Sequence, residues 1–520
     1  MKPFRVAACQ VRAFDLEDAE ANLANLLHAL DEAGAAGADL ALLPEVSYPA
    51  YYLRDAAPYA RPGVRPFAEV RDLLAAKAKQ HGYWLAAGIA VPHDDGSLTN
   101  SGLVFNPAGE MAGRYDKSFL WHFDSTWFQP GREYPVFDMG FAKCGILICA
   151  DGRMPEIARS LVLGGAEVIL DLTAWVASAR RTADLDNPQR EYMMPVRAFE
   201  NGVWVIAADK CGNEDGTIAY AGRSCVIDPS GNTTAIATAD EEMVLVQDIA
   251  PAPPPELVPR RPGLYGRLTQ PTASLPILAV LEEPVVPARS AARVAVIPGD
   301  GRFDAEALIR RYEAVRRQDA DVIVASSGIG PESWRAGLPR IESAVRTWGG
   351  ALVFAVQTDT GGGTETAVLV TPDGSWEHQA THGRGIVTGE VASPVVETPA
   401  GNLGLLCGDE GLVPEVARCL MLEGADILAW PQFATHPMTE RLARTRADEN
   451  RVYVATAWTG GGLVVSPPGG VIAASPAGTN LAMSAPISRA LSRLKDMAPC
   501  TNVVTDRIPE AYGRLVRPGG

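Results

Sequence analysis

The stretch GILICADGRMPE, residues 145–156, places a cysteine where a strand gives way to a helix. Its first four residues form a short apolar run that predicts a buried strand, and Cys149 follows at the carboxyl end. Residues 150–152 break the strand, and Pro155-Glu156 begins a helix. A sharp strand-to-helix turn of this kind holds a nucleophile above a sheet. The motif alone is weak, because buried cysteines are common and mostly inert.

The composition indicates a soluble, multidomain protein. A chain of 520 residues is too long for one ordinary core and predicts two or more domains. Its residues are 47% hydrophobic and 21% charged, as in globular proteins. The formal net charge of −16 argues against nucleic acid or an anionic membrane as a partner.

Several classes of site and location are disfavoured by the sequence. The first residues, MKPFRVAACQV, lack a signal-peptide pattern, and no run of 18 apolar residues occurs. The eight cysteines form no CxxC pair, and the seven histidines form no HxH pair. We therefore expect a cytoplasmic protein with reduced thiols, no metal and no cofactor.

Strands and helices alternate along the first half of the chain, with hairpins between some of them. This pattern predicts a layered α/β domain with helices packed over sheets. Apolar runs predict strands over residues 4–10, 39–44, 83–91, 168–172 and 203–208, and a hairpin over residues 101–106 and 113–116. The 3.6-residue apolar period predicts helices over residues 16–34, 69–81 and 189–200, and a further helix ends at Leu163.

The second half of the chain repeats the first. FRVA at residues 4–7 returns as ARVA at residues 292–295, and PGLYGRL at residues 262–268 returns as PEAYGRL at residues 509–515. The offset between copies falls from 288 residues at Val6/Val294 to 247 at Tyr265/Tyr512, so the second copy is shorter. We predict a duplicated domain, with one copy at residues 1–270, a linker at 271–290 and a second copy at 291–520.

Three residues of the first copy carry the chemistry that this cysteine needs. Glu45 follows a buried strand in LLPEVSYP, Lys117 lies in GRYDKSFLW after the hairpin, and Cys149 ends its own strand. With these motifs in this order, the first copy resembles the carbon–nitrogen hydrolase (nitrilase) superfamily, whose catalytic residues are Glu, Lys and Cys. The resemblance covers about residues 4–270, and weakly 292–515.

The resemblance assigns a role to each residue, and physical chemistry supports those roles. A thiol with a pKa near 8.5 is mostly protonated at neutral pH, so Cys149 needs a base such as Glu45. Lys117 would place positive charge beside the oxyanion formed by thiolate attack. The backbone N–H of Ala150, directly after the nucleophile, would be the second donor to that oxyanion.

The loop FDSTWFQPG carries a departure from the family pattern. Members of the family usually have a Glu in an ExxxFxxG motif between the lysine and the cysteine, and this chain has Asp124 there. The carboxylate is one methylene shorter and could position Lys117 or the base. Trp121 and His122 in the same loop, and Trp175 in DLTAW, are candidates for the substrate pocket, although simple packing explains the aromatic residues equally well.

The residues after the cysteine indicate the substrate class. Nitrile-hydrolysing relatives usually carry a CWE pattern, whereas this chain reads CADGRMPE, closer to the CxDxRxPE of amidases and carbamoylases. We therefore expect hydrolysis of an amide or N-carbamoyl C–N bond of a small molecule through a thioester, with release of ammonia. A nitrilase, a thiol-dependent acyltransferase and a catalytically silent binding protein are the alternatives.

The second copy lacks the catalytic residues at matching positions. Ser327 takes the place of Glu45, His382 that of Lys117, and Gly408 that of Cys149. Cys407 lies one residue too early, where strand alternation turns it to the other face. The resemblance implies a four-layer αββα sandwich in each copy. Because family members pair into αββα–αββα dimers, we expect the second, non-catalytic copy to act as the partner within an intrachain pseudo-dimer. A higher homo-oligomer is also possible.

Overall fold

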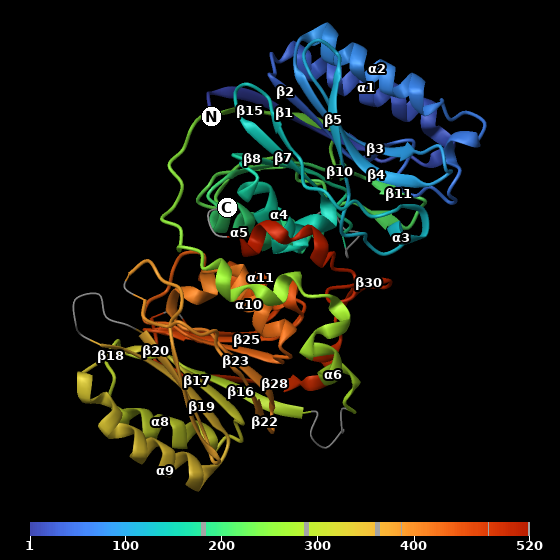
Figure 1. Ribbon diagram of the computed structural model, residues 1–520. Coiled ribbons are helices and arrows are strands. Elements are labelled where there is room, and N and C mark those ends of the chain that lie inside the picture. The colour runs from blue at the N-terminus through green and yellow to red at the C-terminus, as the bar shows by residue number, and fades with distance from the viewer. Residues whose placement is uncertain (178–183, 285–290, 359–364, 386, 477, 518–520) are drawn as a thin grey trace. The chain divides into compact units, whose positions relative to one another are not determined.

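The computed structural model describes residues 1–177, 184–284, 291–358, 365–385, 387–476 and 478–517. The chain divides into two compact units (Figure 1). Unit 1 comprises Met1–Pro255 with Ala498–Thr501, and unit 2 comprises Glu256–Met497 with Asn502–Gly519. The sequence repeat predicts domains at residues 1–270 and 291–520 with a linker between them, and these boundaries stay predictions. Residues 285–290 of the predicted linker lie outside the described residues.

The first sheet of unit 1 holds the strand that carries Glu45. Its strand order is β10-β1-β2-β3-β4-β5, and β15 pairs antiparallel with residues 4–10 of β1. Strands β1, β2 and β3 are parallel, while β4 and β5 form the predicted hairpin. The strands are β1 (Phe4–Arg12), β2 (Leu40–Tyr48), β3 (Trp84–Pro92), β4 (Leu98–Phe105), β5 (Met111–Asp116), β10 (Lys210–Cys211) and β15 (Met243–Ile249).

Two amphipathic helices cover the outer face of this sheet (Figure 1). They are α1 (Ala19–Ala35) and α2 (Phe67–His81). Leu26, Leu30, Leu74 and Ala78 enter one apolar core with alternate residues of the strands, as the 3.6-residue period requires. The predicted helix over residues 16–34 begins with a separate 3₁₀ turn, Leu16–Asp18.

The second sheet of unit 1 carries Cys149 at one end. Its strand order is β14-β13-β9-β8-β7-β6, with β7, β8 and β9 parallel. The strands are β6 (Val136–Asp138), β7 (Lys143–Ile148), β8 (Val168–Leu172), β9 (Trp204–Ala208), β13 (Cys225–Ile227) and β14 (Thr233–Ile236). This sheet contacts the first sheet, and α4 (Pro155–Leu163) and α5 (Met194–Asn201) pack on its outer side. The predicted helix over residues 189–200 begins as a π-helical turn, Gln189–Met193.

Unit 2 repeats the four layers (Figure 1). One sheet has the order β21-β20-β19-β17-β16-β28, and the other has the order β22-β23-β24-β25-β26-β27. The first sheet packs against α8 (Ala305–Arg316) and α9 (Leu338–Trp348), the second against α10 (Pro414–Leu422) and α11 (Thr439–Asn450). The strands are β16 (Ala291–Ile297), β17 (Val322–Ala325), β19 (Ala351–Thr358), β20 (Glu365–Thr371), β21 (Gly374–Gln379), β22 (Val395–Thr398), β23 (Gly401–Leu405), β24 (Ile427–Pro431), β25 (Tyr453–Trp458), β26 (Gly461–Val465), β27 (Val471–Ala474) and β28 (Met483–Ser488). The four-layer αββα fold is thus present in each unit.

Buried polar contacts repeat between the copies as closely as the elements do. In unit 1, fully buried Arg197 donates to the carbonyl of Gly152 and pairs with Glu200 at 2.6 Å. In unit 2, Arg446 donates to the carbonyl of Gly411 and pairs with Glu449 at 2.8 Å. Each arginine thus links a helix, α5 or α11, to the 3₁₀ turn that contains Cys149 in unit 1 and Gly408 in unit 2. These matched contacts confirm the duplication at the level of individual side chains.

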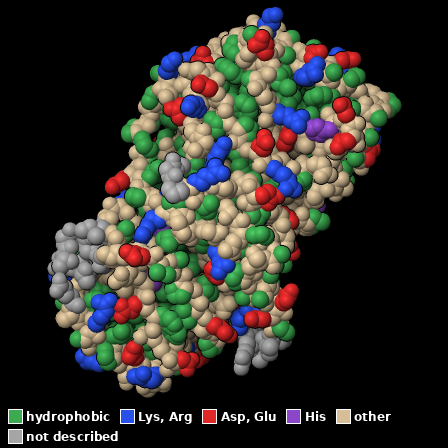
Figure 2. All heavy atoms as spheres, viewed as in Figure 1, with side chains coloured by type: hydrophobic (Ala, Val, Ile, Leu, Met, Phe, Trp, Pro, Cys, Tyr) green, Lys and Arg blue, Asp and Glu red, His purple; other side chains and the backbone are tan. Residues whose placement is uncertain are grey.

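The surface carries both acidic and basic side chains. On the face drawn in Figure 2, acidic and basic side chains of the described residues are interspersed rather than gathered into one patch. Within the described part of the chain, no helix is both long enough and apolar enough to cross a bilayer.

Candidate active site

A buried lysine lies between two buried carboxylates in unit 1. Lys117 Nζ is 2.6 Å from Glu45 Oε1 and 2.5 Å from Asp124 Oδ2, and none of the three side chains is exposed. Tyr51 donates its hydroxyl to Asp124 Oδ1 at 3.1 Å, and the backbone N–H of Trp121 donates to Asp124 Oδ2. Two carboxylates offset part of the cost of burying one ammonium group, and further hydrogen bonds to the carboxylates add to this effect. Three of the four predicted catalytic residues therefore form one cluster.

The fold brings these residues together from three separate elements. Glu45 lies in β2, Lys117 directly follows β5, and Asp124 begins the short helix α3 (Asp124–Trp127). Close packing of β3 against β2 needs Gly88, because a Cβ there would lie 2.2 Å from the carbonyl oxygen of Pro44. The backbone N–H of Glu45 also donates to the carbonyl of Thr173 beyond β8, at 3.4 Å. That bond links the Glu45 strand to the sheet that carries Cys149.

Glu45 retains one free carboxylate oxygen. Its Oε1 accepts from Asn100 Nδ2 at 2.7 Å as well as from Lys117, whereas its Oε2 is buried with no hydrogen-bond partner among the described residues. Burial raises the pKa of Glu45, and Lys117 and Asn100 only partly oppose the rise. A carboxylate with a free oxygen and a raised pKa has the properties of a general base.

Lys117 is held in its charged form. Burial lowers the pKa of its ammonium group, but Asp124 and Glu45 outweigh this effect and keep the pKa well above its ordinary value. The Cys149 sulfur acts in the same direction, so it lies within electrostatic reach of the ammonium group. The site therefore contains a permanent positive charge near the thiol.

Cys149 occupies a strained backbone position. Its φ of 50° lies in the left-handed region, which non-glycine residues adopt at a cost of about 1–3 kcal/mol. The conformation is held from both sides, because the Cys149 N–H donates to Asp171 Oδ1 at 3.0 Å and its carbonyl accepts from Gln189 Nε2 at 2.5 Å. Gly408 adopts the same conformation in unit 2, with φ 52°. Glycine adopts this φ without strain, and the fold accepts it at the matching position of unit 2. The strain at Cys149 therefore favours a chemical rather than a structural role for its side chain.

The Cys149 thiol does not ionise by itself. Burial and the charge of Glu45 raise its pKa well above the ordinary value, and Lys117 and the hydroxyl of Thr173 oppose the rise only in part. A thiol in this state needs a base in order to attack. Glu45 is the carboxylate with the strongest electrostatic influence on it.

Asp151 links the turn after β7, which contains Cys149, to the segment that carries Lys117. Its carboxylate accepts the N–H groups of Ile148, Ser118 and Phe119 and the hydroxyl of Tyr115, at 2.7–3.1 Å. Burial raises the pKa of Asp151 to about 6 in spite of these bonds. The bonds reach both β7 and the residues after β5, so they set the position of Cys149 relative to Lys117.

The four predicted binding residues differ in how the structure places them. Ala150 lies in the 3₁₀ turn Cys149–Arg153, at a helix start where backbone N–H groups lack intrahelical partners. Trp121 is partly exposed and packs against Arg153, whose guanidinium carbon is 4.7 Å from the ring centroid. His122 is partly exposed and its N–H donates to Thr501 Oγ1. Trp175 is fully buried, and its N–H donates to Asp209.

Several residues that contact the candidate catalytic groups were not predicted from the sequence. Asn100 binds Glu45, Tyr51 binds Asp124, and Asp171 and Gln189 hold the backbone of Cys149. No local motif marks them. The internal repeat gives one signal, since Trp430 replaces Asp171 at the matching position of β24 and donates to the carbonyl of Gly408 instead. Across the described residues, no group of three His, Cys, Asp or Glu side chains is arranged to hold a metal.

Comparison with known proteins identifies the family. The model of the carbon-nitrogen hydrolase family matches residues 5–252 and 342–493. This chain belongs to the carbon–nitrogen hydrolase family. The two matched segments lie one in each copy, so the second copy is a family domain as well. Membership makes the protein a hydrolase that acts on C–N bonds other than peptide bonds.

Individual relatives match about one copy of this carbon–nitrogen hydrolase. A nitrilase of Pyrococcus abyssi is 34% identical over 222 residues, which are 42% of this chain and 80% of that protein. The omega-amidase NIT2-B of Xenopus laevis is 28% identical over 261 residues, 48% of this chain and 89% of that protein. Among solved structures, an amidase from Nesterenkonia sp. is 27% identical, with 48% of this chain and 90% of that chain covered and a TM-score of 0.42.

Proposed function

We propose that unit 1 hydrolyses a small amide or N-carbamoyl compound, with Cys149 as nucleophile, Glu45 as base and Lys117 as oxyanion donor. The observation that carries this proposal is the fully buried Glu45–Lys117–Asp124 cluster. Its members Glu45 and Lys117 act on the pKa of the strained Cys149. A cluster of three buried charges is costly for a purely structural role, because apolar residues would pack there at lower cost. Its place beside a cysteine of positive φ favours catalysis.

The first half-reaction forms a thioester. Glu45 Oε2 accepts the thiol proton as the sulfur of Cys149 bonds to the substrate carbonyl carbon, whose oxygen becomes an oxyanion. Lys117 and the Ala150 N–H donate to that oxygen, and a donor of this kind contributes about 3–4 kcal/mol to the transition state. When the tetrahedral intermediate collapses, its C–N bond breaks. Glu45 returns its proton to the leaving nitrogen, so ammonia leaves and the acyl group stays on sulfur.

The second half-reaction uses the same groups. Glu45, ionised again, removes a proton from a water molecule whose oxygen attacks the thioester carbonyl, and the same two donors hold the new oxyanion. Collapse breaks the C–S bond, and the proton on Glu45 restores the thiol of Cys149. The product is a carboxylic acid, or carbamic acid from an N-carbamoyl substrate, which decomposes to carbon dioxide and an amine.

An amide substrate is favoured over a nitrile. The residues after Cys149 lack the CWE pattern, and one of the relatives above is named an omega-amidase. The relative named a nitrilase keeps nitriles in the test panel.

Ammonia release from a panel of primary amides, N-carbamoyl compounds and nitriles tests the proposal. We expect release from the first or second class, and a mass increase equal to the acyl group on the peptide that contains Cys149. Cys149→Ala should abolish both signals. Cys144→Ala is the matched control, because Cys144 is a fully buried cysteine of β7, the strand that leads to Cys149, and burial raises the pKa of its thiol. Activity that survives Cys149→Ala would refute the proposal.

A further inference from the structure

Unit 2 holds a cavity at the position of the catalytic site. Its volume is about 350 Å³, and Gly408 and His382, the residues that stand for Cys149 and Lys117, are part of its wall. Cys407 does not supply a nucleophile there, because it is fully buried in an apolar cluster with Ala355, Ala367 and Ala380. The cavity therefore persists without the groups that act on a substrate in unit 1.

The carboxylate of Glu365 occupies the space that a side chain at position 408 would enter. Glu365, the first residue of β20, stands 265 residues after Asn100, the same offset that relates Gly109 to Gly374 in the two hairpins. A Cβ built on Gly408 would lie 2.1 Å from Glu365 Oε2. The carboxylate thus lies where a cysteine side chain would begin, and it lines the cavity.

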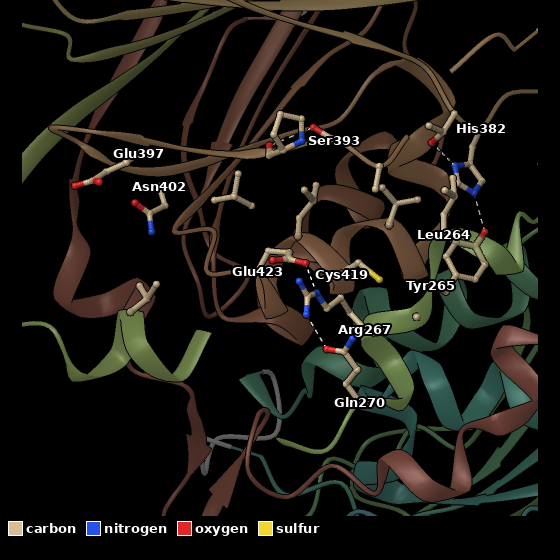
Figure 3. Close-up of a pocket in the computed structure, with 18 of the residues that line it drawn as sticks. Leu264, Tyr265, Arg267, Gln270, His382, Ser393, Glu397, Asn402, Cys419 and Glu423 are labelled. Carbon is tan, nitrogen blue, oxygen red and sulfur yellow. Dashed lines mark hydrogen bonds and ion pairs between the residues drawn. The ribbon is translucent and has the colours of Figure 1, made fainter. Parts of the chain in front are cut away.

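Arg384 and His382, two basic side chains of this cavity wall, are already hydrogen-bonded. The guanidinium group of Arg384 makes two hydrogen bonds to the carboxylate of Asp409, at 2.8 and 3.0 Å. His382 bonds to the hydroxyls of Tyr265 and Thr381 through its two ring nitrogens, both at 2.7 Å (Figure 3). Burial lowers the pKa of His382 to about 4, so it is neutral at neutral pH.

Glu365 is left with an unsatisfied acceptor. Its Oε1 is buried and has no hydrogen-bond partner among the described residues. Burial raises the pKa of Glu365 to about 7, although the Ser327 hydroxyl opposes the rise. A buried carboxylate oxygen without a donor is costly, and a cation that donates a hydrogen bond to it removes that cost. Around it, Leu412, Trp430 and Phe433 give the cavity an apolar wall.

We propose that this cavity of unit 2 binds a small primary alkylammonium compound, whose ammonium group donates to Glu365 while its carbon chain packs against Trp430 and Phe433. An ammonium group supplies both the charge and the donors that Glu365 lacks. The inference goes beyond the proposed function of unit 1 and does not depend on turnover at Cys149.

Calorimetric titration of the full chain with n-butylammonium near pH 8 tests the proposal, since most of Glu365 is ionised there. We expect one saturable binding event that Glu365→Gln weakens at least about tenfold, as for a charge-assisted hydrogen bond. Glu397→Gln is the matched control. Glu397 is exposed and lines the neighbouring cavity of about 690 Å³ (Figure 3), so its substitution makes the same charge change outside the proposed site.

Two further outcomes decide the proposal. Equal affinity of the Glu365→Gln variant and the unmodified chain for butylammonium would overturn it, as would the absence of any binding at millimolar concentration. If Glu365→Gln does not fold, butyrate on the unmodified chain decides instead. It has a chain of similar length and the opposite charge, so binding as tight as that of butylammonium would overturn the proposal, and much weaker binding would support it.

Discussion

The ammonium group of Lys117 and the carboxylate of Asp124 lie 2.5 Å apart, with both side chains fully buried. Asp124 is therefore an electrostatic partner of Lys117, although it is one methylene shorter than the glutamate usual at this place in the family. The short helix α3 brings its carboxylate close enough, and Tyr51 and the Trp121 N–H orient it. We infer that Asp124 positions Lys117 and does not touch the substrate.

Asp124→Asn should lower kcat by about 100-fold, the loss expected when an oxyanion donor is weakened. Asp124 raises the pKa of Lys117, so its neutralisation lets the ammonium lose its proton at lower pH. The alkaline limb of the rate profile should therefore move to lower pH. A pH–rate profile of kcat measures both effects.

Two variants control the Asp124 experiment. Asp124→Glu restores the carboxylate and should recover much of the activity and the position of the alkaline limb. Asp116→Asn removes a carboxylate of β5 that accepts from Ser101 rather than from Lys117, and should leave kcat within about twofold. An unchanged profile in Asp124→Asn would show that Lys117 does not depend on this partner.

Glu45→Gln should reduce kcat/KM by about three orders of magnitude, as for the loss of a general base. In the unmodified enzyme, burial raises the pKa of Glu45 above its ordinary value of 4.5. The base must be ionised, so activity should fall as the pH drops through this raised pKa. The acid limb should therefore lie above pH 4.5. In Glu45→Gln the residual rate should lack this limb, and a limb that persists would assign it to another group.

Much of the candidate site follows from the sequence because Glu45, Lys117 and Cys149 lie in or directly after strands that apolar patterns predict. Strand β8 is observed at the predicted residues 168–172, and helix α2 begins two residues before its predicted start and ends at the predicted residue, His81. The motifs around Glu45 and Lys117 predict that both belong to one site, and in the structure Lys117 Nζ lies 2.6 Å from Glu45 Oε1. These predictions depend on local apolar patterns, which fix strand and helix positions within a few residues.

The residues that were not predicted make contacts with residues far away in the sequence. Asn100 and Asp171 act across strand pairs and turns that are far apart in the chain, so no local pattern marks them. The strained φ of Cys149 likewise depends on the folded turn after β7 and has no local sequence signal. Comparison of the two copies at matched positions recovers part of this information, because Glu365 and Trp430 differ from Asn100 and Asp171 where the chemistry differs.

Asp151 of unit 1 and Glu410 of unit 2 stand at matching positions of the two copies. Asp151 accepts from the N–H groups of Ile148 and Phe119, and Glu410 accepts from those of Cys407 and Thr381. Asp151→Asn and Glu410→Gln should each lower the free energy of unfolding by about 1–3 kcal/mol, since an amide offers one acceptor oxygen where the carboxylate offers two. Scanning calorimetry of each variant measures the loss of stability.

Activity separates the two variants. Asp151 fixes Cys149 relative to Lys117, so Asp151→Asn should also lower kcat, whereas Glu410→Gln should leave kcat near that of the unmodified enzyme. A comparable loss of kcat in both variants would indicate that unit 2 contributes to catalysis.

The role of the second copy as an intrachain partner can be tested by the size of the full chain in solution. A tethered copy meets its partner at high effective concentration, so a pseudo-dimer should form within one chain at any dilution. A compact chain of 520 residues has a radius of gyration of about 24 Å, whereas two tethered domains that do not associate would exceed about 30 Å. Small-angle X-ray scattering of the monomeric fraction should give the smaller value. The larger value would leave the second copy without a partner role and would favour a separate function such as ligand binding at Glu365.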